Sequence, residues 1–415
     1  MSFNLAEGAK RAVEDLKELA ALTADENGAQ RVAWTPEWQK ARDWFKAKAE
    51  EMGAMVTIDS AGNQWAKMEG ETEEAVAIGS HLDCVPNGGG LDGALGVAAG
   101  LEVLRQYHKH GIKPRKTLYA VNWADEEGAR FGYSCLGSSA ASGSLNIHEL
   151  MGRSDVNGVK FEEAVRTYGV EPANMLDAHA QMDARNLRSY LELHIEQGPV
   201  LENTDKDISC VYGAAGVERH SIEFTGQSSH AGSFPTGMRQ DAFLAAAQSA
   251  LAFKEIALKY NAVCTVGQVR VEPDVVTIVP GKCVISLDQR TIDPDDLKKM
   301  HEEARQVVEQ ASKDHGVTAK WGKICTVAPQ LFDECLIELC KAVVEEQIGE
   351  PTAMYSGPLH DAVEMASQVP TVMMFVMSEG GLSHCKQEHT PDDKLEKGIQ
   401  AFLWLVDKVV NIGGI

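Results

Sequence analysis

The stretch AVAIGSHLDCVPNGGGLDGALG, residues 75–96, decides how the rest of the chain is interpreted. It begins with an apolar run typical of a buried strand and continues through a Gly-rich turn into apolar residues at helical spacing. His81, Asp83 and Asp92 follow the strand, at the position where open α/β sheets bind ligands. Imidazole and carboxylate together suit zinc, manganese or cobalt. The stretch therefore predicts a metal site. The alternative is a hydrogen-bonded histidine beside two turn aspartates.

Composition limits the class of protein. A length of 415 residues predicts two or three domains, and 44% hydrophobic with 24% charged residues is ordinary for a globular chain. The net charge of −22 disfavours nucleic acid and anionic membranes as partners. Nine cysteines without a C-x-x-C pair, no apolar signal segment and no apolar run near 18 residues predict a reduced, cytoplasmic protein that does not span a membrane.

Two further segments place polar side chains after predicted strands. The strand at 117–121 leads into Asp125, Glu126 and Glu127. In a strand-like conformation the two glutamates would point to opposite sides, so that one binds a metal while the other faces water or substrate. Residues 191–196 alternate apolar and polar and contain His194. The alternatives are a solvated loop for the glutamates and a core or edge position for the histidine.

The order of the remaining segments predicts an α/β chain with an insertion. A Thr-Pro pair at 35–36 predicts a helix start, and 55–58 with 64–68 predict a hairpin. The pattern changes after residue 211. Helices are predicted at 241–258 and 293–316, and strands at 221–224, 263–271, 284–287 and 317–327. This β-α-β-β-α-β order is ferredoxin-like. We therefore expect a catalytic domain formed by 1–211 and 328–415, and an inserted domain at 212–327.

A third polar region lies at 356–362 and 381–384, and it supplies His384. Together with the earlier positions it completes a set of imidazoles and carboxylates at strand ends or turns. Such a set is the right inventory for a pair of divalent metals that share one carboxylate. The candidate ligands are His81, Asp92, Glu127, His194 and His384.

Longer motifs carry a family resemblance across nearly the whole chain. They are GSHLDCVPNGGGLDGALG, DEEGARFGYSCLGS, ELHIEQGPVLE, SSHAGSFPTGMRQDA and GLSHCKQEHTPDD. They resemble the dinuclear-zinc exopeptidase and amidohydrolase superfamily. Within it they are most similar to the hydantoinase/carbamoylase branch of N-carbamoyl-L-amino-acid hydrolases, allantoate amidohydrolases and β-ureidopropionases. The resemblance implies a mixed-sheet catalytic domain sandwiched by helices, with an inserted ferredoxin-like domain that acts as lid and dimerisation domain. It also implies a homodimer with two divalent ions, zinc first and manganese, cobalt or nickel as alternatives.

The resemblance also implies roles for the metal-site residues. Asp92 would bridge the metals, with two histidines on one side and a glutamate and a histidine on the other. Glu126 would be the general base that deprotonates the water between the metals, and Asp83 would orient His81. The implied ligands on the two sides of Asp92 are His81 with His194, and Glu127 with His384.

Other positions match residues that hold the substrate in the family. Arg290 would pair with a substrate carboxylate, for which its planar fork is suited. His230, on the inserted domain, would stabilise the tetrahedral intermediate after that domain closes. The remaining substrate-binding residues implied by the resemblance are Gln197, Thr277 and His360.

Three departures concern the substrate. Thr277 stands where the family usually has Asn, Pro358-Leu359 where it has Ala-Gly, and Phe234 where it has Thr. They indicate an altered, more apolar pocket. We expect a small-molecule substrate with a carboxylate, an N-carbamoyl amino acid converted to amino acid, CO2 and ammonia. The alternatives are hydrolysis of another N-acyl amino acid or dipeptide-like conjugate, a catalytically silent binding protein, and a two-metal phosphoesterase that uses Arg239 and Arg290.

Overall fold

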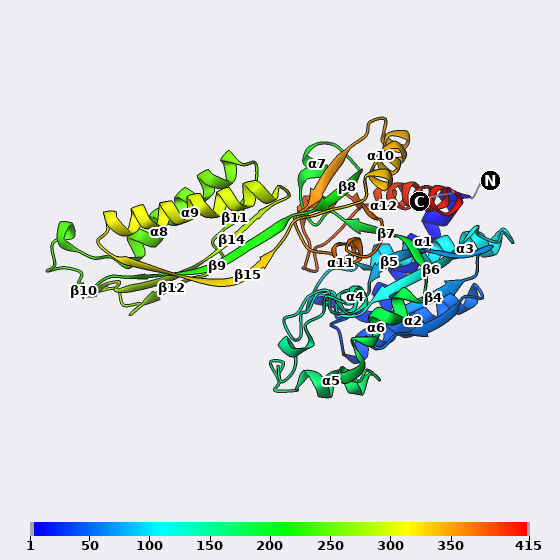
Figure 1. The fold of residues 1–415 in the computed structure, drawn as a ribbon, viewed down its shortest axis with the longest axis horizontal. Coiled ribbons are helices and arrows are strands. Elements are labelled where there is room, and N and C mark those ends of the chain that lie inside the picture. The colour runs from blue at the N-terminus through cyan, green and yellow to red at the C-terminus, as the bar shows by residue number, and fades with distance from the viewer. Residues whose placement is uncertain (1–3, 413–415) are drawn as a thin grey trace. The chain divides into compact units, whose positions relative to one another are not determined.

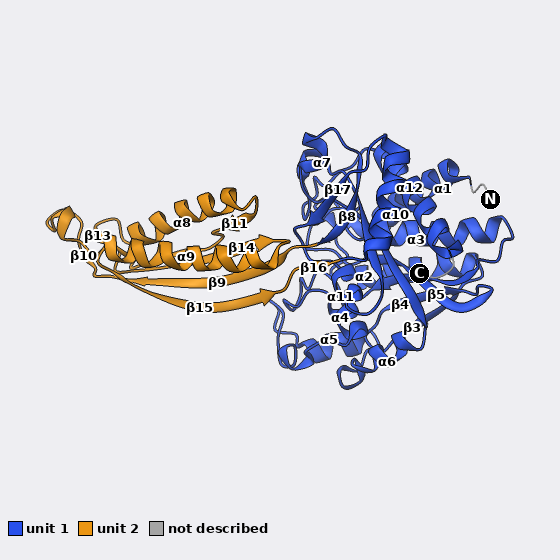
Figure 2. Cartoon of the chain, turned by 45° about the horizontal axis from the view of Figure 1, so that its top comes forward, with its two compact units in different colours: residues 1–213, 332–415 blue, residues 214–331 orange. Residues whose placement is uncertain are grey.

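The computed structural model describes residues 4–412 and divides the chain into two compact units (Figure 2). Unit 1 comprises Met1–Gly213 and Phe332–Ile415, and unit 2 comprises Ala214–Leu331. The segment expected to form an inserted domain, 212–327, covers nearly the same residues as unit 2. Each unit has its own hydrophobic core, so each is described by itself.

Unit 1 is built on one mixed sheet (Figure 1). Its strands follow the order β8-β18-β7-β5-β6-β4-β3, and β17 pairs with β8. The central strands β18, β7, β5 and β6 run parallel, and the flanking pairs β8–β18, β4–β6 and β3–β4 are antiparallel. The bounds are β3 Met55–Ile58, β4 Gln64–Met68, β5 Thr72–His81, β6 Lys116–Trp123, β7 Leu187–Ile195, β8 Ile208–Ala214, β17 Ala353–Ser356 and β18 Thr371–Val376.

Helices cover both faces of this sheet, which gives the mixed α/β sandwich. Strand β5 shows the reason: Val76 and Ile78 belong to one core cluster, and Ala75 and Ala77 to another, because successive side chains point to opposite faces. The first face packs against α1 Leu5–Thr23, α2 Pro36–Glu51, α3 Ala94–Lys109, α10 Glu334–Ile348 and α12 Asp392–Asn411. The second packs against α4 Leu136–Ser142, α6 Asp177–Asp183 and α11 Asp361–Ala366.

The helix start predicted at 35–36 is confirmed. Thr35 caps α2, its Oγ1 accepts the Trp38 N–H at 3.3 Å, and Pro36 occupies the first helical position. Trp38 is fully buried beside Trp34. Aromatic packing of this kind makes the tryptophans part of the core rather than of a binding surface.

Unit 2 is a five-stranded antiparallel sheet with two helices on one face. Its sheet order is β11-β14-β9-β15, with β12 pairing β14 beyond β11, which is the ferredoxin-like order. The bounds are β9 Gly216–Thr225, α8 Ala242–Lys259, β11 Val263–Thr265, β12 Val269–Glu272, β14 Lys282–Thr291, α9 Pro294–Asp314 and β15 Thr318–Val327. A separate short ladder joins β10 Ser229–His230 to β13 Ile278–Val279.

Two predictions about elements were wrong or incomplete. The strand predicted at 263–271 is broken into β11 and β12, because Gly267 and Gln268 donate their N–H groups to Ser286 Oγ at 3.2 and 3.0 Å instead of to a ladder carbonyl. The helices α4, α5 Phe161–Thr167 and α6 were not predicted, since seven residues carry too little periodicity.

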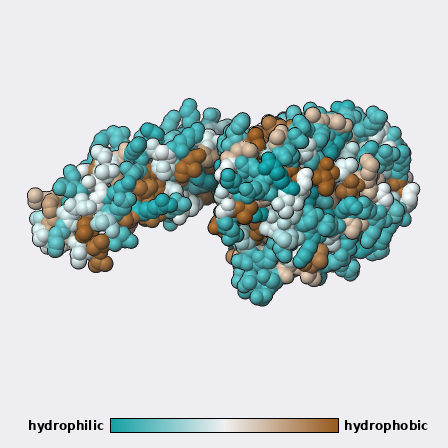
Figure 3. Space-filling view, turned by 90° about the horizontal axis from the view of Figure 1, so that it is seen from below, coloured by the Kyte–Doolittle hydropathy of each residue, from teal (hydrophilic) through white to brown (hydrophobic). Residues whose placement is uncertain are grey.

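Short elements complete the chain. They are β1 Ala24–Asp25, β2 Gly28–Ala29, α7 Val200–Asn203, β16 Gln330–Leu331, η1 Ile147–Glu149, η2 Pro172–Asn174, η3 Thr236–Met238 and η4 Glu379–Gly381. All nine cysteines are free thiols, as the sequence predicts. In the view of Figure 3, hydrophobic residues form separate patches among hydrophilic ones. Within residues 4–412, no helix is both long enough and apolar enough to cross a bilayer.

Candidate metal centre and active site

The candidate ligands of unit 1 come together because they follow strands of the same sheet. His81 is the last residue of β5, and His194 is the penultimate residue of β7. Glu127 follows β6, and His384 lies in the loop after β18. The four strands are parallel, so their carboxyl ends meet at one edge of the sheet.

Asp92 lies at the centre of these ligands. Its Oδ1 is 3.6 Å from His81 Nε2 and 3.1 Å from His194 Nε2. Its Oδ2 is 3.2 Å from His384 Nε2, which is also 3.3 Å from Glu127 Oε2. The donor atoms form two groups that share Asp92, each with its atoms within 4.8 Å of one another: His81, Asp92 and His194, and Asp92, Glu127 and His384.

Backbone carbonyls orient the two buried histidines. His81 Nδ1 is 3.0 Å from the Asp83 carbonyl oxygen, and His194 Nδ1 is 2.9 Å from the Ile195 carbonyl oxygen. A carbonyl accepts and never donates, so Nδ1 carries the proton in each ring. The Nε2 lone pair of a neutral ring then faces Asp92, as a metal ligand requires.

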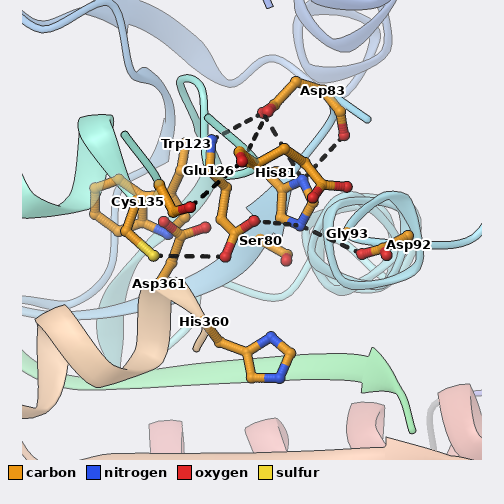
Figure 4. A network of polar contacts seen from close by, with 12 residues as sticks. Ser80, His81, Asp83, Asp92, Gly93, Trp123, Glu126, Cys135, His360 and Asp361 are labelled. Carbon is orange, nitrogen blue, oxygen red and sulfur yellow. Dashed lines mark hydrogen bonds and ion pairs between the residues drawn. The ribbon is translucent and has the colours of Figure 1, made fainter. Parts of the chain in front are cut away.

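Asp83 orients His81 through its backbone carbonyl, and its carboxylate has a further role. Its carboxylate lies 3.7 Å from His81 Nδ1, and it is the Asp83 carbonyl that orients the ring. The carboxylate instead accepts the N–H group of Glu126 at 3.2 Å (Figure 4). It also accepts the N–H group of Glu127 at 3.1 Å. Asp83 therefore fixes the backbone that presents both glutamates.

The two adjacent glutamates diverge, although the strand-like conformation predicted for them is wrong. They lie in a bend after β6, where Asp125 has a φ of 57°. Glu126 Oε2 points to His81 Nε2 at 3.6 Å, whereas Glu127 Oε2 points to His384. The bend thus separates a carboxylate beside one histidine pair from a carboxylate beside the other ligand group.

Glu126 occupies a buried, strongly acidic position. Burial raises its pKa well above the ordinary value, and the charges of Asp361 and Glu127 raise it further. Cys135 Sγ lies 3.5 Å from Glu126 Oε1 (Figure 4). Glu126 is therefore a carboxyl group that holds a proton readily in the metal-free protein.

Carboxylates outnumber imidazoles at this edge of the sheet. Burial raises the pKa of Glu127 and that of Asp125 to about 8, and repulsion from Asp92 and Asp83, respectively, adds to this effect. Within residues 4–412, Glu127 Oε1 is buried without a hydrogen-bond partner. Divalent cations would supply both the missing partner and the missing charge, so the donor set fits them. The buried carboxylates are Asp83, Asp92, Asp125, Glu126, Glu127, Glu192, Asp361 and Glu388, and the imidazoles are His81, His194, His360 and His384.

Two histidines also have raised pKa values, which in their case favours the charged form. Burial lowers the pKa of His194, but the hydrogen bond to Asp92 and the charge of Asp92 outweigh it and raise the pKa to about 9. The hydrogen bond to Asp92 raises the pKa of His384 to about 9, against a smaller effect of burial. In return, these bonds hold the pKa of Asp92 well below its usual value despite burial. In the metal-free protein, protons on the histidines compensate part of the carboxylate charge.

Gln197 and His360 also lie beside the ligands of unit 1. Gln197 Nε2 donates to Asp92 Oδ2 at 2.7 Å, and its Oε1 is buried with no hydrogen-bond partner among the residues that the structure describes. His360 packs edge-on against His194, with ring centroids 4.5 Å apart, and its Nε2 is 2.9 Å from Ser356 Oγ. Burial holds the pKa of His360 well below its usual value, and the neighbouring His194 adds to this effect.

The other predicted substrate-binding residues belong to unit 2. His230 Nδ1 accepts the N–H groups of Gly232 and Ser233 at 3.0 and 3.1 Å, so a neutral ring carries its proton on Nε2. Thr277 lies close by in the same unit, where its carbonyl accepts the Ala231 N–H at 2.9 Å.

Arginines of unit 2 have defined partners. Arg290 Nε donates to Asp288 Oδ1 at 2.8 Å, and Arg219 Nε donates to Asp288 Oδ2 at 2.7 Å. Arg239 donates to the carbonyl oxygens of Ala231 and Phe234, at 2.6 Å and 3.0 Å. Arg239 therefore holds the loop after His230, a use the sequence analysis did not anticipate.

Glu192 was missed because of the pattern that revealed His194. Alternation at 191–196 is typical of a half-exposed strand, but β7 lies between β5 and β18 and both its faces are buried. Glu192 accepts the hydroxyls of Ser80 at 2.7 Å and Tyr190 at 3.0 Å. The available signal was that Glu192 is a polar residue two positions from the candidate ligand His194, in the same strand and on the same face.

Comparison with known proteins identifies the family of the chain. Residues 77–408 match the profile of peptidase family M20/M25/M40. The chain is 32% identical over 376 residues to an N-carbamoyl-L-amino acid amidohydrolase of Geobacillus stearothermophilus, covering 90% of this chain and 91% of that protein. It is 29% identical over 388 residues to the allantoate amidohydrolase of Bacillus subtilis, covering 92% and 93%.

A solved structure shows the same fold. The hydantoinase/carbamoylase family amidase of Burkholderia multivorans superimposes with a TM-score of 0.88 at 32% identity, covering 96% of this chain and 97% of that one. Both the sequence match and the superposition extend over nearly the whole chain. The chain therefore belongs to peptidase family M20/M25/M40, as a hydrolase of its hydantoinase/carbamoylase branch.

Proposed function

We propose that this protein is a metal-dependent amidohydrolase that cleaves the linear amide bond of N-carbamoyl amino acids. The observation that carries the proposal is the pair of donor groups sharing Asp92, with Glu126 directly beside them. The names of the relatives indicate the substrate class, since they include N-carbamoyl-L-amino acid and allantoate amidohydrolases. One water is consumed, and the products are an amino acid, CO2 and ammonia.

Two divalent ions would be held by the two groups, with zinc first and manganese, cobalt or nickel as alternatives. His81 and His194 would hold one ion, Glu127 and His384 the other, and Asp92 would contact both. When bound, such ions supply Lewis-acid polarisation of a carbonyl group and acidify water. Oxygen and imidazole ligands suit all four of these metals, so the donor set does not select one of them.

Glu126 would act as the general base. Its carboxylate would accept a proton from the attacking water and return it to the leaving nitrogen. The raised pKa of Glu126 suits this proton transfer, and bound cations would act in the opposite direction by favouring the carboxylate form. Asp83, which accepts the Glu126 N–H, would hold the base in place.

Residues of unit 2 would bind the substrate. His230 would donate its Nε2 proton to the developing oxyanion, a donor that the two backbone N–H groups at Nδ1 already orient. Arg290 would pair with the substrate carboxylate, while Asp288 limits the rotation of its guanidinium. Thr277, Gln197 and His360 remain proposed as substrate-binding residues, and unit 2 as the lid.

The alternative is hydrolysis of another N-acyl amino acid or of a dipeptide-like conjugate. The observation that favours it is Thr277, an exposed residue that offers a hydroxyl where the family usually has an amide. The phosphoesterase hypothesis is less well supported. It uses Arg239 to bind phosphate, but Arg239 already donates to two carbonyl groups.

Ammonia release tests the proposal. Purified protein loaded with zinc or manganese would be assayed on N-carbamoyl amino acids, ureidopropionate and allantoate, with N-acetyl amino acids and dipeptides beside them. We expect ammonia from the ureido compounds, loss of the activity with chelator, and its return with added metal. Hydrolysis of N-acyl substrates alone would support the alternative. Metal binding without turnover of any substrate would support the silent binding protein.

We also propose a homodimer formed through unit 2 in a reducing compartment such as the cytoplasm. Apolar side chains are exposed along α8, and edge strands β11 and β12 expose further valines: Phe243, Leu244, Leu251, Leu258, Val263 and Val269. Exposed apolar surface of this kind marks protein–protein contacts. Light scattering tests it: a mass of twice 45.0 kDa supports the dimer and a mass of 45.0 kDa excludes it.

A further inference from the structure

A buried carboxylate joins the two loops that carry Asp92 and His384. Glu388 Oε1 accepts the N–H groups of Leu91 at 2.9 Å and of Asp92 at 3.1 Å. Its Oε2 accepts the hydroxyl of Ser383 at 2.7 Å. Glu388 lies in the loop of His384 and contacts the backbone of Asp92, so one side chain fixes the distance between the two loops.

Ser383 strengthens this connection. Its Oγ lies 3.1 Å from Asp92 Oδ2 and 2.7 Å from Glu388 Oε2. It precedes His384, whose φ of 56° is in the left-handed region. A histidine in this backbone conformation needs surrounding contacts to keep it there. Glu388 is therefore linked to Asp92 in two ways. It accepts the Asp92 N–H directly, and Ser383 lies between Glu388 and the Asp92 carboxylate.

The Gly-rich turn makes room for Glu388. A Cβ atom at Gly89 would lie 2.0 Å from Glu388 Oε1, which no real contact allows. A Cβ atom at the neighbouring Gly90 would meet only Ala20 Cβ at 3.9 Å, an ordinary contact. Gly89 is thus required by the position of Glu388, and Gly90 is not.

We propose that Glu388 is a positioning residue that holds Asp92 and His384 at metal-binding separation and so sets the affinity of the group Asp92, Glu127 and His384. The other group depends on it less, because its histidines lie at the ends of β5 and β7 and are oriented by carbonyls of their own segments. The proposal rests on the metal pair of the proposed function. It predicts that loss of Glu388 weakens one ion and leaves the second tightly bound.

Calorimetric titration of Zn²⁺ into the metal-free protein, against a competing chelator, tests the proposal without any substrate. For Glu388→Ala we expect a roughly 10- to 100-fold loss of affinity for one of two ions, the usual effect of removing a group that orients metal ligands. Glu388→Gln keeps a carbonyl oxygen as acceptor for both N–H groups and should stay within about threefold of wild type. The control is Glu379→Ala, because Glu379 is an exposed glutamate that also follows β18.

The adjacent glycines give a matched pair. Gly89→Ala should weaken the same ion as Glu388→Ala, whereas Gly90→Ala should bind as wild type. In the Glu388→Gly background, Gly89→Ala should cost little more, because the three atoms nearest its Cβ are the Oε1, Cδ and Cβ of Glu388, and all three are then absent. This dependence separates a specific contact between Gly89 and Glu388 from general damage to the turn.

The outcomes distinguish this proposal from the proposed function. Wild-type protein that binds no Zn²⁺ overturns the metal pair and this proposal with it. If wild type and Glu388→Ala both bind two ions tightly, only the role of Glu388 is overturned. The same holds if Glu388→Ala and Glu388→Gln lose Zn²⁺ affinity equally. If circular dichroism shows Glu388→Ala unfolded, Ser383→Ala decides. It removes the hydroxyl bridge only, and we expect a loss of about fivefold, from one hydrogen bond of about 1 kcal/mol.

Discussion

The polar groups of unit 1 and unit 2 are held in different ways. In unit 1, His81, His194 and Asp92 are almost fully buried, and their side chains contact one another. In unit 2, His230 is exposed on a two-residue strand, and backbone N–H groups orient its ring. Unit 1 therefore contains a prebuilt donor set, whereas unit 2 contains single donors that are oriented only locally.

Because of this difference, charge repulsion matters most in unit 1, whereas the replacement of bound water matters most in unit 2. Buried carboxylates that repel one another are tolerated only when protons or cations compensate them, so the donor set of unit 1 fits a cation. The exposed donors of unit 2 retain their water until a ligand replaces it, so their substitution should change substrate use more than metal content. Substitutions in the two units should therefore have separable effects on metal content and on substrate use.

Asp92→Asn should have the largest effect, because this carboxylate belongs to both donor groups. We expect loss of both ions and turnover no higher than that of chelator-treated wild type. Metal content by mass spectrometry and ammonia release measure the two effects. Retention of two ions by this variant would contradict the central position of Asp92.

Glu126→Gln should keep both ions and lose turnover. The amide cannot accept the proton from water, and general-base catalysis contributes roughly 10²- to 10⁴-fold. Metal content and kcat would be measured on the same preparation. Near-normal turnover in this variant would remove Glu126 from the mechanism.

Arg290→Met should act on the substrate and spare the metals. Loss of a charge-assisted hydrogen bond to a carboxylate costs about 1.5–3 kcal/mol, which corresponds to a roughly 10- to 100-fold fall in kcat/KM. The change should appear mainly in KM. Arg270→Met, at an exposed arginine of β12, is the control and should leave KM unchanged. Equal effects of the two substitutions would argue against a specific carboxylate contact.

Thr277→Asn should have a smaller effect, of opposite sign. It restores an amide where the family usually has one, and one added hydrogen bond of about 1 kcal/mol gives a roughly fivefold rise in kcat/KM for N-carbamoyl amino acids. Competition between N-carbamoyl and N-acetyl substrates measures the preference. A shift toward the N-acetyl substrate would favour the alternative function.

The pH dependence of stability should differ between metal-free and metal-loaded protein. The pKa of His194 is about 9 in the folded metal-free protein against 6.5 ordinarily, so its contribution is fully present below pH 6.5 and lost as pH rises through 9. The pKa of Glu127 is raised from 4.5 to about 8, so this group also lowers the stability of the metal-free protein as pH rises above 4.5. We expect the Tm of metal-free protein to fall by a few degrees between pH 6.5 and 9, by scanning calorimetry.

Metal-loaded protein is the control for this prediction. Its ligands are already deprotonated, so the same pH range should not lower its Tm through these groups. Parallel curves for the two forms would show that His194 and Glu127 do not titrate as their surroundings indicate.

Much of the fold and of the candidate site could be predicted from local sequence. Asp241 and Asp293 begin α8 and α9 as expected, because their carboxylates accept N–H groups of the first helical turn. The hairpin of β3 and β4 has the expected bounds. The ligand positions could be proposed because side chains that follow parallel strands meet at one edge, whatever the packing behind them.

Other features depend on contacts between distant segments. Glu388 lies 296 residues from the Asp92 N–H that it accepts, and Asp83 lies 43 residues from the Glu126 N–H. A carboxylate has several possible donors within reach, and only the folded backbone determines which of them it meets. The break between β11 and β12 has the same origin, since a hydroxyl of the neighbouring strand replaces a ladder carbonyl.

The sequence alone therefore determined the kinds of donor, their places at strand ends and the starts of the helices, because these follow from spacing and local hydrogen bonding. Tertiary structure decided burial and orientation. Glu192 and His194 are buried because β7 lies inside the sheet, and Gly89 is needed because Glu388 comes from another loop. Spacing along the chain carries no information about which segments lie opposite one another, and those segments set the environment of every buried charge.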